Sequence, residues 1–112
     1  MRIFPSASRY FLYMDAADMR KSYNGLSILV KHAMKQDLHS GDGYVFVNKR
    51  RTMVKILIWD RNGLVIFQKR LSRGTIQLPN NGGRISSATL MMMLEGVDLR
   101  SIKYRKRYQK RA

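Results

Sequence analysis

The sequence contains no cysteine in its 112 residues and few acidic residues. Without cysteine there are no disulfide bonds, no cysteine-ligated zinc and no thiol nucleophile, and the absence says nothing decisive about compartment. Seven Asp and Glu stand against 22 Lys and Arg, which gives a formal net charge of +15. Because such a charge repels itself at low salt, it predicts a polyanionic partner, with nucleic acid the first candidate and a membrane surface the second.

Long apolar runs are also missing. No stretch reaches the length of a membrane span, and residues 1–5 lack the apolar run of a signal peptide. We therefore expect a cytoplasmic protein that does not bind a membrane. The hydrophobic fraction of 45% is ordinary for a folded chain. We expect one domain at residues 1–98, followed by a basic tail at residues 99–112.

The residues that usually carry catalysis are few and scattered. Among the acids, Asp18 suits a helix N-cap, Asp60 opens a turn, and Glu95 and Asp98 close a helix, so no carboxylate cluster for metal catalysis is indicated. The two histidines stand seven positions apart, and Gly82-Gly83 lacks the Lys-Ser/Thr of a phosphate loop. We expect no catalytic residues, no metal, no cofactor and no enzymatic activity.

Hydrophobic patterning predicts the order of elements. Residues 9–14, 44–47 and 75–78 favour short strands, and residues 53–71 favour a hairpin. A helical stripe begins at Met19, with Asp15 and Asp18 as plausible caps, and continues to residues 36–39. Gly25 inside it indicates the close approach of another element.

A second, short helix is expected at residues 87–95. Ser86 is its N-cap, Ile85 and Leu90 form a hydrophobic staple, and Gly96 ends it. The predicted fold class is α+β: a small antiparallel sheet built around a central hairpin, packed by one long helix and one short C-terminal helix, with the basic tail.

The hairpin carries the most informative pattern. Asn62-Gly63 between two apolar runs predicts a tight turn, with Lys55 opposite Arg70; a three-residue loop would instead place Lys55 opposite Lys69. Like charges directly opposed cost stability, which suggests a bound anion between them. One hairpin face is then the core. The other mixes cations, aliphatic residues and Trp59, and it could contact a groove or unpaired bases.

The positive charge is clustered. Residues 43–73 hold eight cations and one acid, and the tail adds seven cations and no acid. Cationic strands also protect sheet edges, and Trp59 could simply be core. On the charge pattern we predict nucleic-acid contacts by Lys49, Arg50, Arg51, Lys55, Trp59, Lys69, Arg70, Arg73, Arg100, Lys103, Arg105, Lys106 and Arg107. The tail contacts should be mostly to phosphate.

An ordered set of motifs resembles one family. It comprises Asp18-Met19-Arg20-Lys21, Gly25-Leu26, Tyr44 to Arg51, Lys55 to Asp60, Asn62-Gly63, Lys69-Arg70-Leu71, Gly74, Pro79 and Leu94 to Asp98. In this order and spacing, over residues 9–98, the chain resembles TnpB, the second-open-reading-frame protein of bacterial transposons of the insertion sequence 66 family. The family usually has an aromatic residue just before the proline, where this chain has Leu78.

The resemblance implies a transposition accessory protein encoded beside a separate transposase that carries the catalytic acids. The leading hypothesis is a non-catalytic factor that binds DNA, either transposon ends or duplex in general, and works with the transposase of its own element. One alternative is a protein-interaction subunit that docks on the transposase without touching DNA. The other is a small RNA-binding protein.

Overall fold

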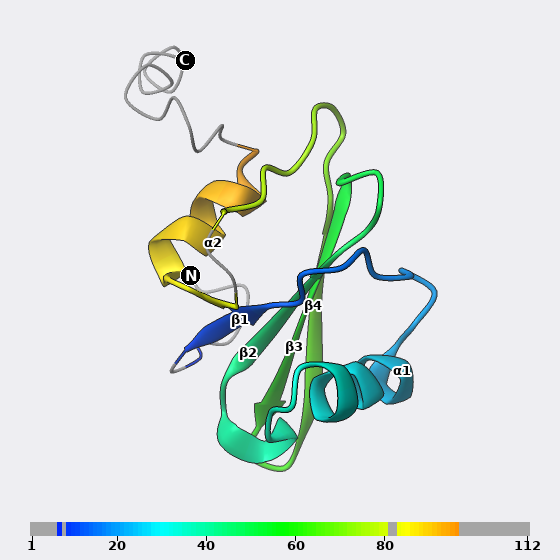
Figure 1. The fold of residues 1–112 in the computed structure, drawn as a ribbon, viewed down its shortest axis with the longest axis vertical. Coiled ribbons are helices and arrows are strands. Elements are labelled where there is room, and N and C mark those ends of the chain that lie inside the picture. Colours follow the sequence, from blue (N-terminus) through cyan, green and yellow to red (C-terminus); the bar gives the residue numbers. More distant parts are fainter. Residues whose placement is uncertain (1–6, 8, 81–82, 97–112) are drawn as a thin grey trace.

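The computed structural model describes residues 7, 9–80 and 83–96, and its elements form three layers around one sheet (Figure 1). The strands lie in the order β4-β3-β2-β1-β5. They are β1 (Tyr10–Leu12), β2 (Gly43–Val47), β3 (Met53–Asp60), β4 (Gly63–Arg70) and β5 (Arg84–Ile85). The helical elements are α1 (Tyr23–Ile28), the π-helical η1 (Leu29–Ala33), the 3-10 turn η2 (Leu38–Ser40) and α2 (Ser87–Leu94). The predicted α+β class is confirmed.

The sheet is mixed, so the expectation of an antiparallel sheet is wrong. β1 pairs with β2 in parallel, with Tyr10 opposite Gly43 and Leu12 opposite Val45. The other pairs, β1–β5, β2–β3 and β3–β4, are antiparallel. A parallel pair needs a long crossover connection, and the segment carrying α1, η1 and η2 supplies it.

The first helix is shorter than expected. It starts at Tyr23 rather than Met19, and after α1 it continues through η1 only to Ala33. Asp18 does not cap it, because the Asp18 carboxylate accepts a hydrogen bond from the backbone N–H of Arg20 (2.9 Å) and pairs with its guanidinium (2.8 Å). The atoms nearest to a Cβ built at Gly25 belong to the Lys21 side chain, four residues earlier, with its Cβ at 3.0 Å, and not to another element as expected.

The second helix follows its sequence signals. The Ser86 hydroxyl oxygen accepts a hydrogen bond from the backbone N–H of Thr89 (3.0 Å), which caps the helix. At the other end Gly96 adopts a φ of 73°, the left-handed conformation that ends many helices. The expected staple residues Ile85 and Leu90 are both buried in one cluster.

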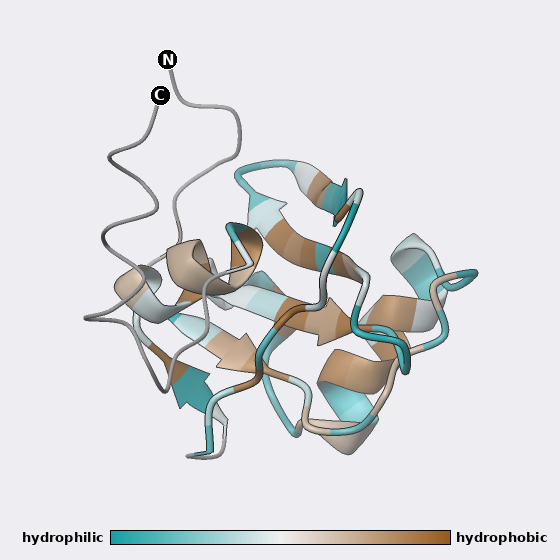
Figure 2. Ribbon diagram, turned by 90° about the horizontal axis from the view of Figure 1, so that it is seen from above, coloured by the Kyte–Doolittle hydropathy of each residue, from teal (hydrophilic) through white to brown (hydrophobic). Residues whose placement is uncertain are grey.

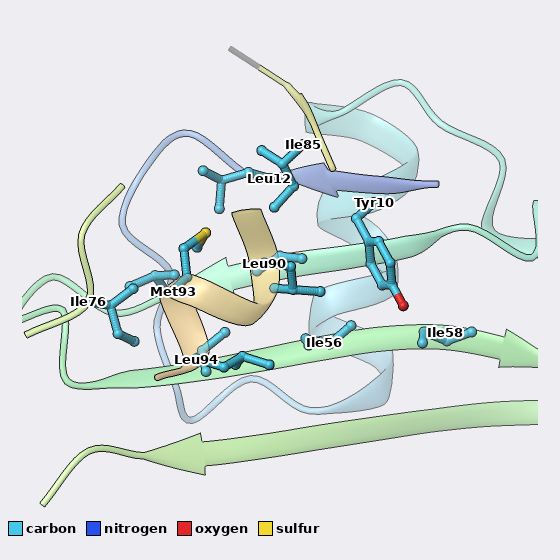
Figure 3. Packing of buried hydrophobic residues seen from close by; sticks show 12 residues of the cluster. Tyr10, Leu12, Ile56, Ile58, Ile76, Ile85, Leu90, Met93 and Leu94 are labelled. Carbon is cyan, nitrogen blue, oxygen red and sulfur yellow. The ribbon is translucent and has the colours of Figure 1, made fainter. Parts of the chain in front are cut away.

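The predicted strand at residues 75–78 is absent. This segment has irregular backbone, and Ile76 donates its N–H to the Arg51 carbonyl (2.6 Å). Its buried side chain packs with α2 residues Leu90, Met93 and Leu94 (Figure 3). The apolar residues that suggested a strand therefore anchor a loop.

The central hairpin is present, but its register differs from both predicted alternatives. Asp60 pairs with Gly63, Lys55 with Gln68 and Met53 with Arg70, so the loop is Arg61-Asn62. The positive φ falls on Arg61 (57°) rather than on Gly63. No like charges face each other in this register, which removes the argument for a bound anion between Lys55 and Arg70 or Lys69.

Alternate strand residues point to opposite faces of the sheet, and buried residues lie on both faces. On one face Val45, Ile56 and Ile58 pack with Leu90 and Met93 of α2 (Figure 3). On the other face the buried residues are Ala17, Leu26, Val30, Tyr44, Phe46 and Leu57. The hairpin face expected to lie open is therefore largely covered by the α1–η1 segment. In Figure 2 hydrophobic residues concentrate on the strands and helices, and hydrophilic residues on the connections.

Lys55 ties the crossover to the middle of the sheet. The residue is only 8% exposed, and its ammonium Nζ donates to the carbonyls of Met19 (2.9 Å) and Lys21 (2.8 Å). These carbonyls belong to the irregular segment that leads into α1. A buried ammonium is tolerable only when such acceptors replace water. The cation inside this apolar strand is thus a structural clamp.

We predict that Lys55→Met lowers the free energy of unfolding by about 2 kcal/mol, since two hydrogen bonds to a charged donor are lost and their carbonyl acceptors stay partly buried. Urea unfolding followed by circular dichroism measures this loss. Lys49→Met, on an exposed turn, is the control and should be neutral within about 0.5 kcal/mol. Equal effects of the two substitutions would contradict the clamp.

Candidate nucleic-acid interface

The β2–β3 turn is held in shape by Asn48. The side-chain oxygen of Asn48 accepts hydrogen bonds from the backbone N–H groups of Thr52 (2.8 Å) and Met53 (3.0 Å), and its amide donates to the Thr52 hydroxyl (3.1 Å). The Arg51 N–H also donates to the Asn48 carbonyl (3.0 Å). Lys49, Arg50 and Arg51 are the exposed residues of this braced turn.

A second cationic segment lies against the turn. Arg70, at the end of β4, pairs with Met53 at the start of β3. Beyond it, the Leu71 N–H donates to the Thr52 carbonyl (2.8 Å), and that of Ile76 to the Arg51 carbonyl (2.6 Å). The bend that carries Arg73 is thereby fixed beside the β2–β3 turn. These loops occupy the top of Figure 1.

We call this surface the basic end, and its members are Lys49, Arg50, Arg51, Arg70 and Arg73. All five are exposed. Within residues 7, 9–80 and 83–96, none of them forms an ion pair with an acid. The acids that do pair have other partners: Asp42 binds Arg9 (2.9 Å) and Asp18 binds Arg20 (2.8 Å). The Arg20 hydrogen bonds hold the pKa of Asp18 well below its usual range, so this pair stays charged at neutral pH.

One backbone conformation at the basic end is unusual. Arg51 has a φ of 59°, a left-handed conformation that glycine and asparagine adopt more easily. It costs a residue with a Cβ roughly 1–2 kcal/mol. An arginine at such a position is a reason to look for a function of its side chain.

Three predicted contact residues lie apart from the basic end. Lys55 is buried in the clamp. The Lys69 ammonium donates a hydrogen bond to the carbonyl of Leu94 (2.7 Å) at the end of α2, where a cation also complements the helix dipole. Trp59 is half-buried near the opposite end of β3, about 20 Å along the strand from Met53. Its ring meets that of His39 edge-on, with centroids 4.4 Å apart.

The predicted tail contacts Arg100, Lys103, Arg105, Lys106 and Arg107 lie outside the described residues. The last described residue, Gly96, is close to the basic end: a Cβ built on it would lie 3.8 Å from a Leu71 methyl group. Sequence reasoning missed the brace formed by Asn48. Its signal was available, because Asn side chains bond readily to backbone N–H groups in turns.

A shallow cleft of about 470 Å³ lies on the α1–η1 side, lined by Ile28, Lys31, His32, Leu38, His39 and neighbouring residues. Ile28 is 58% exposed. In the described part of the chain, no three His, Asp or Glu residues are placed to hold a metal ion. Likewise, neither helix there is both long and apolar enough to cross a membrane.

The fold is thus a three-layer α+β core with a cationic end that has no acid paired to it among the described residues. More specifically, residues 8–104 match the family described as "IS66 Orf2 like protein", and the chain belongs to that family. Membership implies an accessory role in transposition. The chain is similar to two uncharacterized proteins of Sinorhizobium fredii. It is 30% identical to y4hO over 82% of this chain and 83% of the relative, and 28% identical to y4jC over 85% and 84%. No solved structure matches it.

We predict that Asn48→Ala lowers the free energy of unfolding by about 1–2 kcal/mol, because two backbone N–H groups of the turn lose their acceptor. It should also weaken polyanion binding while leaving every charge in place, since the cations lose their fixed spacing. Urea unfolding and heparin-column retention measure the two effects. Asn80→Ala, on an exposed residue, is the control for both. An unchanged stability would show that the brace contributes nothing.

Proposed function

We propose that this protein is a non-catalytic accessory factor of bacterial DNA transposition that binds DNA through the basic end and the cationic residues 99–112. The observation that carries the proposal is the gathering of five exposed cations from two segments, with no acid paired to them among the described residues. Family membership supplies the context of transposition.

Braced turns of this kind suit contacts with phosphate. Arginine and lysine neutralise phosphates and release condensed counterions, which gives affinity independent of sequence. The basic end lacks an exposed aromatic residue, so stacking on unpaired bases is not part of the proposal, and Trp59 and Lys55 are left out of the surface. Duplex DNA, recognised through its backbone, is the favoured form of the ligand.

The central test is a salt titration of binding to transposon ends and to random duplex, with two variants that each lose three charges. One variant changes Lys49, Arg50 and Arg73 to Gln, and the other changes Lys31, Lys35 and Arg61, which are exposed elsewhere. We predict that the first variant lowers the slope of log affinity against log salt by about 3, because each lost phosphate contact removes about 0.9. The second should lower it by less than about 1.

Equal losses in the two variants would show that net charge, rather than the basic end, determines binding. No binding of the wild type to DNA at low salt would reject DNA binding altogether. Competition of RNA against DNA in the same assay separates the RNA-binding alternative. Tighter binding to transposon ends than to random duplex would add sequence specificity.

We predict that Arg51→Gly separates binding from stability. Glycine accepts the left-handed conformation without a Cβ penalty, so the free energy of unfolding should stay the same or rise by up to about 1 kcal/mol. The same variant should bind DNA more weakly, since one phosphate contact is removed. Urea unfolding and fluorescence anisotropy provide the measurements. A stable variant with undiminished affinity would remove Arg51 from the surface.

The second candidate function is docking on the transposase without DNA contact. The exposed Ile28 beside the α1–η1 cleft favours it, because an exposed aliphatic residue at a concave surface suits a protein partner. Co-purification with the transposase after nuclease treatment, and its loss in Ile28→Glu, would support docking. Association that nuclease abolishes would instead support a DNA bridge.

A further inference from the structure

Among the described residues, the sheet ends in a long strand that has no other strand on its outer side. β4 is an edge strand of eight residues. The Leu71 N–H, just after it, donates inward to the Thr52 carbonyl of the β3 side. Successive residues of a strand direct their backbone groups to opposite sides. The odd-numbered residues of β4 therefore face β3 like Leu71, and the even-numbered residues Leu64, Ile66 and Gln68 direct their N–H and C=O groups outward.

Within the described part of the chain, the first five residues of this edge lack the usual protection of their outward backbone groups. Proteins block edge strands with charges, proline, bulges or a covering segment. Residues 63–67 read Gly-Leu-Val-Ile-Phe, with no charge and no proline, and β3 and β4 pair without a bulge. Among the described residues no other segment forms a backbone hydrogen bond with the outward groups. The one nearby cation on the α2 side, Lys69, is turned toward the end of α2.

We propose that β4 pairs with β4 of a second copy of this chain, antiparallel about a two-fold axis at Ile66. This register places Ile66 opposite the partner copy's equivalent residue and Leu64 opposite Gln68. All three outward residues then form hydrogen-bonded pairs, about six bonds in total. The two sheets become one continuous ten-stranded sheet with the same layers on each face.

The charges fit a second copy in this register. Lys69 lies opposite Gly63 of the other copy. Asp60 of that copy pairs with Gly63 across the hairpin, so it lies in the same row and on the same face of the sheet. Gly63 has no side chain, and a Cβ built there would have nothing within 4 Å. Asp60 forms no ion pair within the described part of the chain. The pairing therefore places Asp60 two strands from Lys69 of the other copy on the same face, so the two charges attract at a distance while the Lys69 ammonium keeps its bond to the Leu94 carbonyl.

The pairing also arranges the proposed DNA surface, a consequence that rests on the proposed function. Arg70 of one copy lies opposite residue 62 of the other, so the two basic ends stand at opposite ends of the joined strands. Their Arg70 residues are separated by about 27 Å along the strand direction. This approaches the repeat of about 34 Å in one turn of duplex DNA, which suits two contacts on one duplex.

The test measures the mass of the full-length protein by sedimentation equilibrium at an ionic strength of about 0.5 M, where repulsion between the basic copies is screened. We expect a wild-type dimer. Ile66→Pro removes an outward N–H without touching the β3–β4 ladder, and it should raise the dimer dissociation constant by at least about tenfold. Ile66→Thr keeps the N–H and is the matched control, so it should remain dimeric.

A wild-type monomer at all accessible concentrations would overturn the proposal, whether β4 is then open or covered by residues 97–112 or another protein. A dimer that survives in folded Ile66→Pro would overturn it as well. Should that variant fail to fold, hydrogen exchange of the wild-type amides of Leu64, Ile66 and Gln68 decides. Protection that rises with protein concentration supports the pairing, and protection independent of concentration contradicts it.

The register has its own check. Asp60→Lys should weaken the dimer several-fold, whereas Asp15→Lys, an equal charge change at another exposed acid, should not. Equal effects would contradict the register centred on Ile66. Neither outcome depends on DNA, so the dimer and DNA binding can fail separately.

Discussion

The architecture depends on the burial of the Lys55 ammonium between the sheet and the segment that leads into α1. β3 has buried residues on both faces, so two helical layers must cover it. The crossover from β1 to β2 brings one of these layers into place. The Lys55 Nζ fixes this crossover by bonding to the Met19 and Lys21 carbonyls. α1 then starts late, at Tyr23, because these carbonyls are committed to the clamp rather than to a first helical turn.

Hydrogen bonds to backbone carbonyls also separate the cations that are held within the fold from those that are exposed. Lys55 and Lys69, both on strands, reach carbonyls left open where a helix begins or ends. At the β2–β3 turn, the carbonyls of Asn48, Arg51 and Thr52 already accept backbone N–H groups. All these cations look equally basic in the sequence, yet Lys55 and Lys69 are bonded to backbone carbonyls, whereas the five cations of the basic end are exposed.

Sequence patterns predicted what depends on neighbouring residues. The Ser86 cap, the Gly96 terminus and the two hairpin faces all follow from local chemistry or from strand periodicity. The hairpin register was wrong by one or two residues. A shift of two keeps each side chain on its face, so the Asn62-Gly63 alternative gave correct faces. The parallel β1–β2 pair and the Lys55 clamp were not predictable, because each joins residues more than 30 positions apart.

For the candidate site, the sequence predicted the clustered cations but not their sorting. Charge counting treats Lys49 and Lys55 alike, although one lies on a braced turn and the other is buried. It also gives no role to β4 beyond its cations. Cations at one end of an edge strand repel a partner only if the pairing brings them together, and antiparallel pairing about Ile66 moves them apart. A highly basic chain can therefore present an apolar edge to its own copy while keeping its charge for a polyanion.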